Sequence, residues 1–215
     1  TPSASSSGVT STSSTTTPAA VPGAPTGIAA VANVGAGGIT SNELAASAVT
    51  PAKMSQPLTL GTAVASTSGT SIDFTSIPSW VKRITVMFVG VSTSGTSFPM
   101  IQIGAGSVTT TGYLSAGGNS PNAASTGVNN NTTGFILEGG AAMSAASTVR
   151  HGHILITNAT GNTWVLSALM ANSAGTQIGY GAGSITLSGT LDRVRITTVN
   201  GTDTFDAGSI NILYE

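Results

Sequence analysis

The sequence has 215 residues, a formal net charge of −1 and 6% charged side chains, against roughly 25% in ordinary soluble domains. Its six Lys and Arg residues form no basic stripe, and no apolar run approaches the roughly 20 residues of a spanning helix, so neither nucleic-acid binding nor membrane insertion is expected. The chain has no cysteine, which excludes disulfides, thiol nucleophiles and cysteine metal sites.

Residues 1–40 are predicted to form an extended, low-complexity N-terminal arm. They carry no charged or aromatic side chain, and Pro18, Pro22 and Pro25 interrupt any helix. Two interpretations stay open: a flexible linker, or a segment that becomes ordered in a groove of a larger assembly. The opening TPSASSSGV lacks the basic and apolar regions of a secretory signal, so either it was processed or that export route is not used; we favour the second.

Residues 41–60 are predicted to form a short helical connector. Thr50 is a good N-cap and Pro51 suits the first helical position, whereas Pro57 prevents continuation. Helices this short need apolar partners, which three chains packed around an axis would supply, so we expect a homotrimer. The apolar residues concerned are Leu44, Val49 and Met54.

Residues 61–215 alternate apolar and polar side chains with a period of two and are punctuated by turn residues. This pattern predicts an all-β fold, an antiparallel jelly-roll-like β-sandwich of about eight to ten strands. Trp164 and Leu166 share one face of a strand, and Ile210 and Ile212 alternate in another. The C-terminal residues are therefore expected to lie in a sheet.

The stretch 81–91 is apolar on both faces. Ile84 and Phe88 lie on one face, with Met87 and Val89 on the other. We expect a central strand that is covered on both sides.

Turn and loop signals separate these strands. Residues 158–162 are predicted to join two strands, and Asn200-Gly201 suits a type I′ hairpin. Residues 104–134, rich in Gly and Asn, are predicted to be a long loop rather than core. Loops of this length are usually functional, so partner contact is expected there.

Aromatic and amide side chains in weakly patterned stretches are the candidates for binding a neutral ligand such as a glycan. Trp80 and Trp164 are interpreted instead as packing residues, because each lies at or in an apolar strand. The candidate ligand-binding residues are Tyr113, Asn119, Asn122, Asn129, Asn130 and Tyr180.

No enzymatic activity is expected. The chain has no GxSxG elbow, Walker loop or HExxH helix. Glycoside hydrolysis would need two carboxylates at a set separation, one of them with a raised pKa. Each candidate adjoins a turn or an exposed strand position, where a carboxylate caps backbone groups or pairs with Arg193 or Arg195. The candidates are Glu138, Asp192, Asp203 and Asp206.

His151 and His153 are the one pair of residues with metal-ligand spacing. Strand alternation places both imidazoles on one face. Two ligands do not make a site, although three copies on an axis would provide six nitrogens. We interpret both as ordinary surface or interface histidines and expect no metal and no cofactor.

Three stretches carry a resemblance to a known family: GTSIDFTSIPSWVKRITVMFVGVSTSGTS, the IQIG at 101–104, and SGTLDRVRITTVNGTDTFDAGSINILYE. The region 61–215 resembles the C-terminal domain of bacteriophage tail fibre and tail proteins. ITSNELAASAVTPAKMSQPLT resembles connectors that precede such domains. The resemblance implies a homotrimeric virion appendage, assembled in the bacterial cytoplasm, whose distal domain contacts the host surface. It implies no receptor-binding residue.

Two functions remain in view. The first is a non-enzymatic tail fibre or spike component, attached to other tail or capsid proteins through residues 1–40 and adsorbing to a bacterial receptor or glycan through its β-domain. The alternative is a purely structural virion protein, such as a head decoration protein or tail adaptor. A bacterial surface adhesin is disfavoured because the chain shows no export signal.

Overall fold

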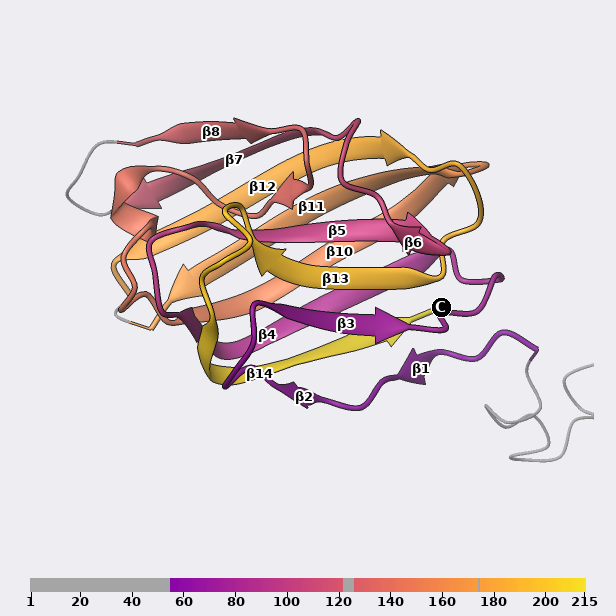
Figure 1. The fold of residues 1–215 in the computed structure, drawn as a ribbon, viewed down its shortest axis with the longest axis horizontal. Helices are drawn as coiled ribbons and strands as arrows, with labels where there is room; N and C mark the ends of the chain where they lie inside the picture. Colours follow the sequence, from indigo (N-terminus) through magenta and orange to yellow (C-terminus); the bar gives the residue numbers. More distant parts are fainter. Residues whose placement is uncertain (1–54, 122–125, 174) are drawn as a thin grey trace, which may run out of the picture. The chain divides into compact units, whose positions relative to one another are not determined.

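The computed structural model describes residues 55–121, 126–173 and 175–215, which form two antiparallel β-sheets (Figure 1). These residues contain no α-helix and one short 3₁₀ turn, η2 (Ala141–Met143). No helix among them is long and apolar enough to cross a membrane. The predictions for residues 1–54, and for Asn122, fall outside the described residues.

The larger sheet has nine strands. Its order is β1-β14-β4-β10-β11-β12-β7-β8, and β2 also pairs with β14. Every pairing is antiparallel. The strands are β1 (Thr59–Leu60), β2 (Val64–Ala65), β4 (Arg83–Thr93), β7 (Leu114–Pro121), β8 (Val128–Asn131), β10 (Arg150–Thr160), β11 (Thr163–Asn172), β12 (Gln177–Thr186) and β14 (Phe205–Tyr214).

The smaller sheet has five strands in the order β3-β13-β5-β6, with β9 also paired to β5. In Figure 1 it lies in front of the larger sheet. The strands are β3 (Ser71–Thr75), β5 (Pro99–Ala105), β6 (Ser107–Val108), β9 (Phe135–Ile136) and β13 (Arg193–Thr198).

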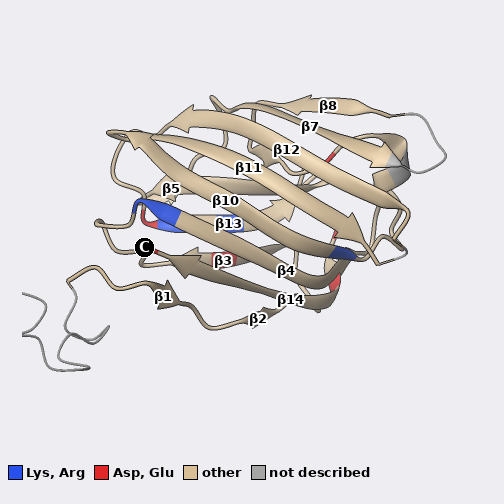
Figure 2. Ribbon diagram, turned by 180° about the vertical axis from the view of Figure 1, so that it is seen from behind, with Lys and Arg blue, Asp and Glu red and all other residues tan. Residues whose placement is uncertain are grey.

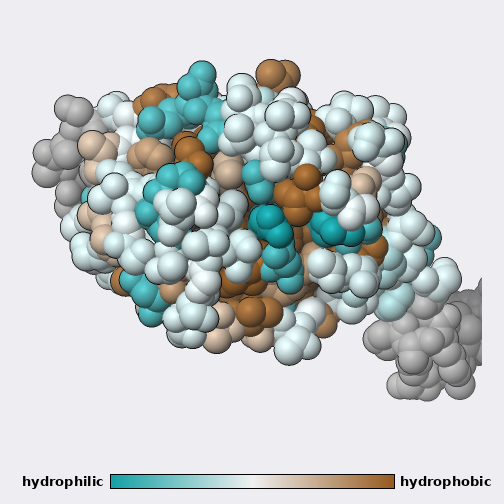
Figure 3. Space-filling model, in the orientation of Figure 1, coloured by the Kyte–Doolittle hydropathy of each residue, from teal (hydrophilic) through white to brown (hydrophobic). Residues whose placement is uncertain are grey.

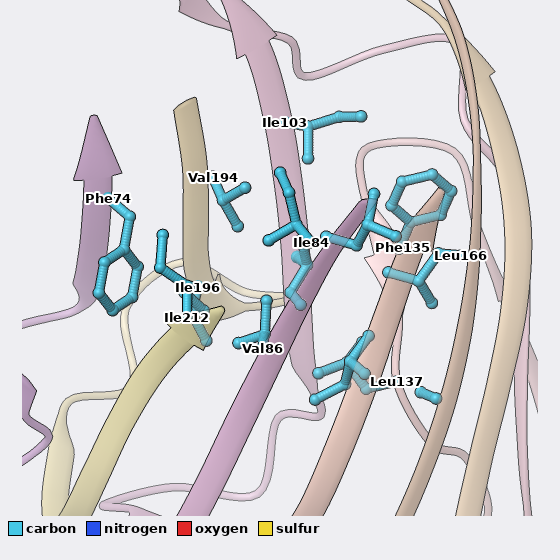
Figure 4. Close-up of a cluster of buried hydrophobic side chains, with 14 of the residues drawn as sticks. Phe74, Ile84, Val86, Ile103, Phe135, Leu137, Leu166, Val194, Ile196 and Ile212 are labelled. Atoms are coloured by element: carbon cyan, nitrogen blue, oxygen red, sulfur yellow. The ribbon is translucent and has the colours of Figure 1, made fainter. Parts of the chain in front are cut away.

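One hydrophobic core joins the two sheets. Alternation along β11 buries Trp164 and Leu166 and leaves Val165 exposed, as a strand with one covered face requires. Figure 4 shows Phe74 and Val194 of the small sheet in the same cluster as side chains of the large sheet. The fold is therefore a sandwich of two antiparallel sheets, and the all-β, antiparallel prediction is confirmed.

Several local predictions are also confirmed. The chain turns between β10 and β11, where Asn158 pairs with Trp164. Strand β14 pairs with β4, so the C-terminal residues do lie in a sheet. Trp164 is buried in the core. Trp80 is partly buried and packs against the core cluster, with its ring centroid 6.0 Å from that of Tyr214.

Three local predictions are wrong. Strand β4 is interior to its sheet, but its second face is not covered within the subunit, because Arg83 and Val89 are exposed there. Asn200-Gly201 is a turn but not a hairpin, since β13 belongs to the small sheet and β14 to the large one. Residues 59–60, predicted to lie in the helical connector, form strand β1.

The prediction of a long loop over residues 104–134 is also wrong. This stretch contains β6, β7 and β8, and β7 pairs with β12 along its whole length. Several of its glycines are required by close packing: a Cβ at Gly117 would lie 2.5 Å from the carbonyl oxygen of Glu138. Small residues permit this approach and remove the hydropathy signal of a strand. Gly106 and Gly112 instead have positive φ and open space around them.

Candidate functional site

The predicted ligand-binding residues within the described ranges lie on or beside β7, β8 and β12. We call the outward-facing side chains at this end of the large sheet the edge patch. Their alignment follows from the register, which places Ala116 between Ala182 and Asn130 and places Gly118 between Tyr180 and Val128. The edge patch consists of Leu114, Ala116, Val128, Asn130, Tyr180 and Ala182.

Tyr180 lies across a glycine in the edge patch. A Cβ at Gly118 would lie 2.8 Å from the Tyr180 ring, so the missing side chain makes room for it. The Tyr180 hydroxyl donates to the backbone oxygen of Asn119 at 3.4 Å, and the residue remains 43% exposed. The result is an aromatic ring held against the sheet with an accessible surface.

A shallow hollow of about 460 Å³ opens over β7, β8 and β12, and Tyr180 is not part of its lining. Leu114, Ala116, Asn130 and Ala182 contribute to its lining. Its walls combine apolar surface with amide and hydroxyl groups and carry no charge. Such a surface suits a neutral, hydroxyl-rich ligand, because amides supply hydrogen bonds and an aromatic face packs on apolar ring surface.

Tyr113 is a structural residue in this fold. Its side chain is fully buried and packs edge-on against Phe135, with centroids 4.9 Å apart. The hydroxyl oxygen accepts the N–H of Ile103 at 2.8 Å, and the hydroxyl lies within reach of the carbonyl oxygens of Ile103 and Thr109. Burial raises the pKa of Tyr113 to about 12. The side chain therefore offers no surface to a ligand.

The amides divide between structural and exposed positions. Asn119 is fully buried, and its Oδ1 accepts the N–H of Gly127 at 2.9 Å. Asn129 is exposed, but its Oδ1 accepts the N–H of Gly140 at 2.9 Å. Asn130 is exposed and lines the hollow. Binding by Asn130 and Tyr180 stays a prediction.

Glu138 and Arg150 form a buried ion pair that the sequence did not reveal. Arg150 Nε donates to Glu138 Oε1 at 2.6 Å, and the two side chains are 1% and 0% exposed. The arginine also donates to the carbonyl oxygens of Thr148 and Met143. Burial raises the pKa of Glu138, and the charge of Arg150 acts in the opposite direction. The expectation that Glu138 lies at an exposed position is wrong.

The other three carboxylates make separate local contacts. Asp192 pairs with Arg193 at 2.7 Å, which lowers the pKa of Asp192. Asp203 accepts the N–H of Ser97, and Asp206 accepts the hydroxyl of Ser92. Asp192 and Asp203 thus have the pairing and capping roles expected of them, whereas Asp206 contacts a side-chain hydroxyl.

His151 is engaged by backbone and side-chain groups of its own subunit. Its Nδ1 accepts the N–H of Gly90 at 3.2 Å, and its Nε2 lies 2.8 Å from the Ser173 hydroxyl. His153 lies on the same exposed face and lines a separate hollow of about 290 Å³ with Arg83. In the part of the chain that the structure describes, no group of three or more potential ligands is close enough to hold a metal ion.

The fold and the site together place the protein in the structural class of two-sheet antiparallel β-sandwiches, with an uncharged edge patch on one sheet. Comparisons with protein-family models, with curated protein sequences and with solved structures found no match.

Proposed function

We propose that this protein is a non-enzymatic bacteriophage virion component, a homotrimeric tail fibre or spike subunit that adsorbs to a receptor or glycan on the bacterial surface through its edge patch. Residues 1–40 attach it to tail or capsid proteins in the virion. The resemblance of residues 61–215 to tail-fibre domains motivates the class. The observation that carries the binding role is the uncharged hollow of the edge patch, with Asn130 in its lining.

The test is competition for adsorption. Host cells are first incubated with the purified protein. Virions that carry the same protein are then added, and their rate of adsorption is measured. The proposal expects slower adsorption with the wild type, and a several-fold weaker effect with Asn130→Ala. Thr75→Ala, at an exposed position on the small sheet, serves as the matched control. Wild-type protein that fails to slow adsorption contradicts the binding role.

A second candidate is a purely structural virion protein, such as a head decoration protein or a tail adaptor. It is favoured by the broad apolar surface on the outside of the large sheet, where Val89 is 60% and Leu169 is 55% exposed. Such surface is more typical of a packing interface than of a sugar site. Protein that incorporates into virions but does not compete for adsorption would support this candidate.

A further inference from the structure

The outward-facing side of the large sheet is unusually apolar over β4, β10, β11 and β12. We call this side the outer face. The register places Met87, His153, Leu169 and Tyr180 side by side across these four strands. Alongside this row lie further exposed apolar side chains of the same face: Val89, Val165 and Ile178.

The outer face is also nearly free of charge. Strands β11 and β12 contain no charged residue, and Arg150 of β10 points into the protein and is 1% exposed. Arg83 of β4 lies at one end of the face, where it pairs with Glu215. Figure 2 views this side and shows the four strands without charge over nearly all their length.

The outside of the small sheet is the opposite case. Arg195 there pairs with Asp73 at 2.7 Å, and Arg193 pairs with Asp192 at the same distance. Figure 3, which views this side, shows hydrophilic side chains gathered over it. One side of the sandwich thus has the surface of a solvated sheet, whereas the other has the composition of a contact surface.

The geometry points to a second copy of this chain as the occupant of the outer face. The four neighbouring strands β4, β10, β11 and β12, of ten or eleven residues each, offer about 650 Å² at the usual strand spacing and rise. Two such faces together bury an area within the range of about 1,200–2,000 Å² that stable interfaces need.

The chemistry of the outer face also favours an identical partner. Identical faces that carry charge repel one another, whereas the outer face brings no like charges together. Small side chains lie between the larger ones on this face, which helps two sheets to approach to about 10 Å, as in the sandwich itself. These small residues are Ser167, Ala171 and Ala182. The contact takes in Tyr180 and Ala182 of β12 and leaves Leu114 and Asn130 of the edge patch open. Two identical faces pair two subunits, so the inference adds a pairing surface to the proposed trimer and does not depend on host adsorption.

The first test is the solution mass of the full chain by light scattering. The wild type is expected at a multiple of 21.0 kDa. Leu169→Lys is expected to give a smaller mass than the wild type, because it places an ammonium in the contact. Thr75→Lys, at an exposed strand position on the small sheet, is expected to keep the wild-type mass. Circular dichroism checks that both variants are folded.

A second measurement locates the contact directly. The chain has no cysteine, so Ser167→Cys and Thr75→Cys each introduce a single thiol. Both positions are exposed in the isolated subunit. In the assembly, a maleimide is expected to modify the thiol at 167 at least tenfold more slowly than the thiol at 75.

The possible outcomes are distinguishable. A wild-type trimer in which Leu169→Lys stays trimeric and the thiol at 167 reacts freely overturns the outer-face inference and leaves the trimer standing. A wild-type monomer overturns both, and adsorption competition still tests the binding role. A monomer with a protected thiol at 167 also overturns the inference, since another part of the chain then covers the face.

Discussion

At the scale of single residues, the Glu138–Arg150 pair is the most demanding feature of the fold. Both ions have left water completely, and their mutual attraction offsets this cost only while both are present. Arg150 gains further hydrogen bonds from the carbonyl oxygens of Met143 and Thr148, so it helps to order the residues around η2.

Removing the carboxylate alone should be strongly destabilising. Glu138→Leu leaves the Arg150 charge buried without its partner, so the free energy of unfolding is expected to fall by about 3–5 kcal/mol in urea denaturation. The double variant Glu138→Leu/Arg150→Met, which removes both charges, should recover much of the loss.

The exposed pair of Asp73 and Arg195 provides the control. Both side chains retain over a third of their exposure, so Asp73→Asn is expected to cost less than about 1 kcal/mol. Equal losses for the buried and the exposed pair would contradict this account.

Tyr113 predicts a loss of stability at alkaline pH. Its folded-state pKa of about 12 lies above the usual 10, so the unfolded chain ionises first as the pH rises. The contribution of the neutral hydroxyl is therefore complete below pH 10 and declines by about 2–3 kcal/mol as the pH approaches 12.

The measurement is urea denaturation of the wild type and of Tyr113→Phe from pH 8 to pH 12. The stability advantage of the wild type, which comes from the hydrogen bonds to Ile103 and Thr109, should shrink above pH 10. An advantage that stays constant over this range would show that the hydroxyl is not protected from ionisation.

At the scale of elements, strand β7 depends on glycine for its close contact with the segment that follows β9. Gly117→Ala would place a methyl group 2.5 Å from the backbone oxygen of Glu138, so the two segments must separate. We expect a loss of about 1–3 kcal/mol in the free energy of unfolding.

Gly189→Ala is the matched control for β7. A Cβ there would lie 3.4 Å from Ala105, which is ordinary contact. Thermal or urea unfolding should show little change for this variant. If the two alanine variants unfold alike, the close approach of β7 is not a constraint.

The contrast between β11 and β7 shows how far sequence reasoning reached. In β11, large apolar side chains alternate with exposed ones, and hydropathy alone predicts the strand. In β7, the sequence LSAGGNSP is mostly small and polar, its one large apolar residue, Leu114, is exposed, and Gly117 is required by a neighbouring segment. The segment that packs against β7 lies outside the strand's own local pattern, so its requirement for small residues in β7 could not be predicted from the sequence.

The candidate site follows the same division. Tyr113 and Asn119 were assigned to a loop because β7 was missed, and both are buried in the fold. Asn130 and Tyr180 are exposed at the edge patch, and their proximity arises from the pairing of β7 with β8 and β12. The pairing of Glu138 with Arg150 likewise depends on tertiary contacts rather than on local pattern.

At the scale of the whole molecule, the two outer surfaces of the sandwich differ in charge, and this predicts how self-association responds to salt. Salt screens attraction between charges and does not weaken contacts between uncharged faces. The assembly should therefore persist from about 0.05 to 1 M NaCl, the range over which surface charges become screened. Sulfate should strengthen it, because excluded salts favour apolar burial. Sedimentation at several protein concentrations checks both effects, and dissociation by NaCl would point to ion pairs instead.

Strand order also bears on synthesis of the protein. Strand β3 pairs with β13, and β4 pairs with β14, each more than 100 residues later in the chain. A nascent chain on the ribosome cannot complete either sheet until those late strands have emerged, and pairings of this range form slowly, in roughly milliseconds to seconds. Until then the apolar β4 lacks one of its neighbours, which makes the growing polypeptide a client for chaperones during translation.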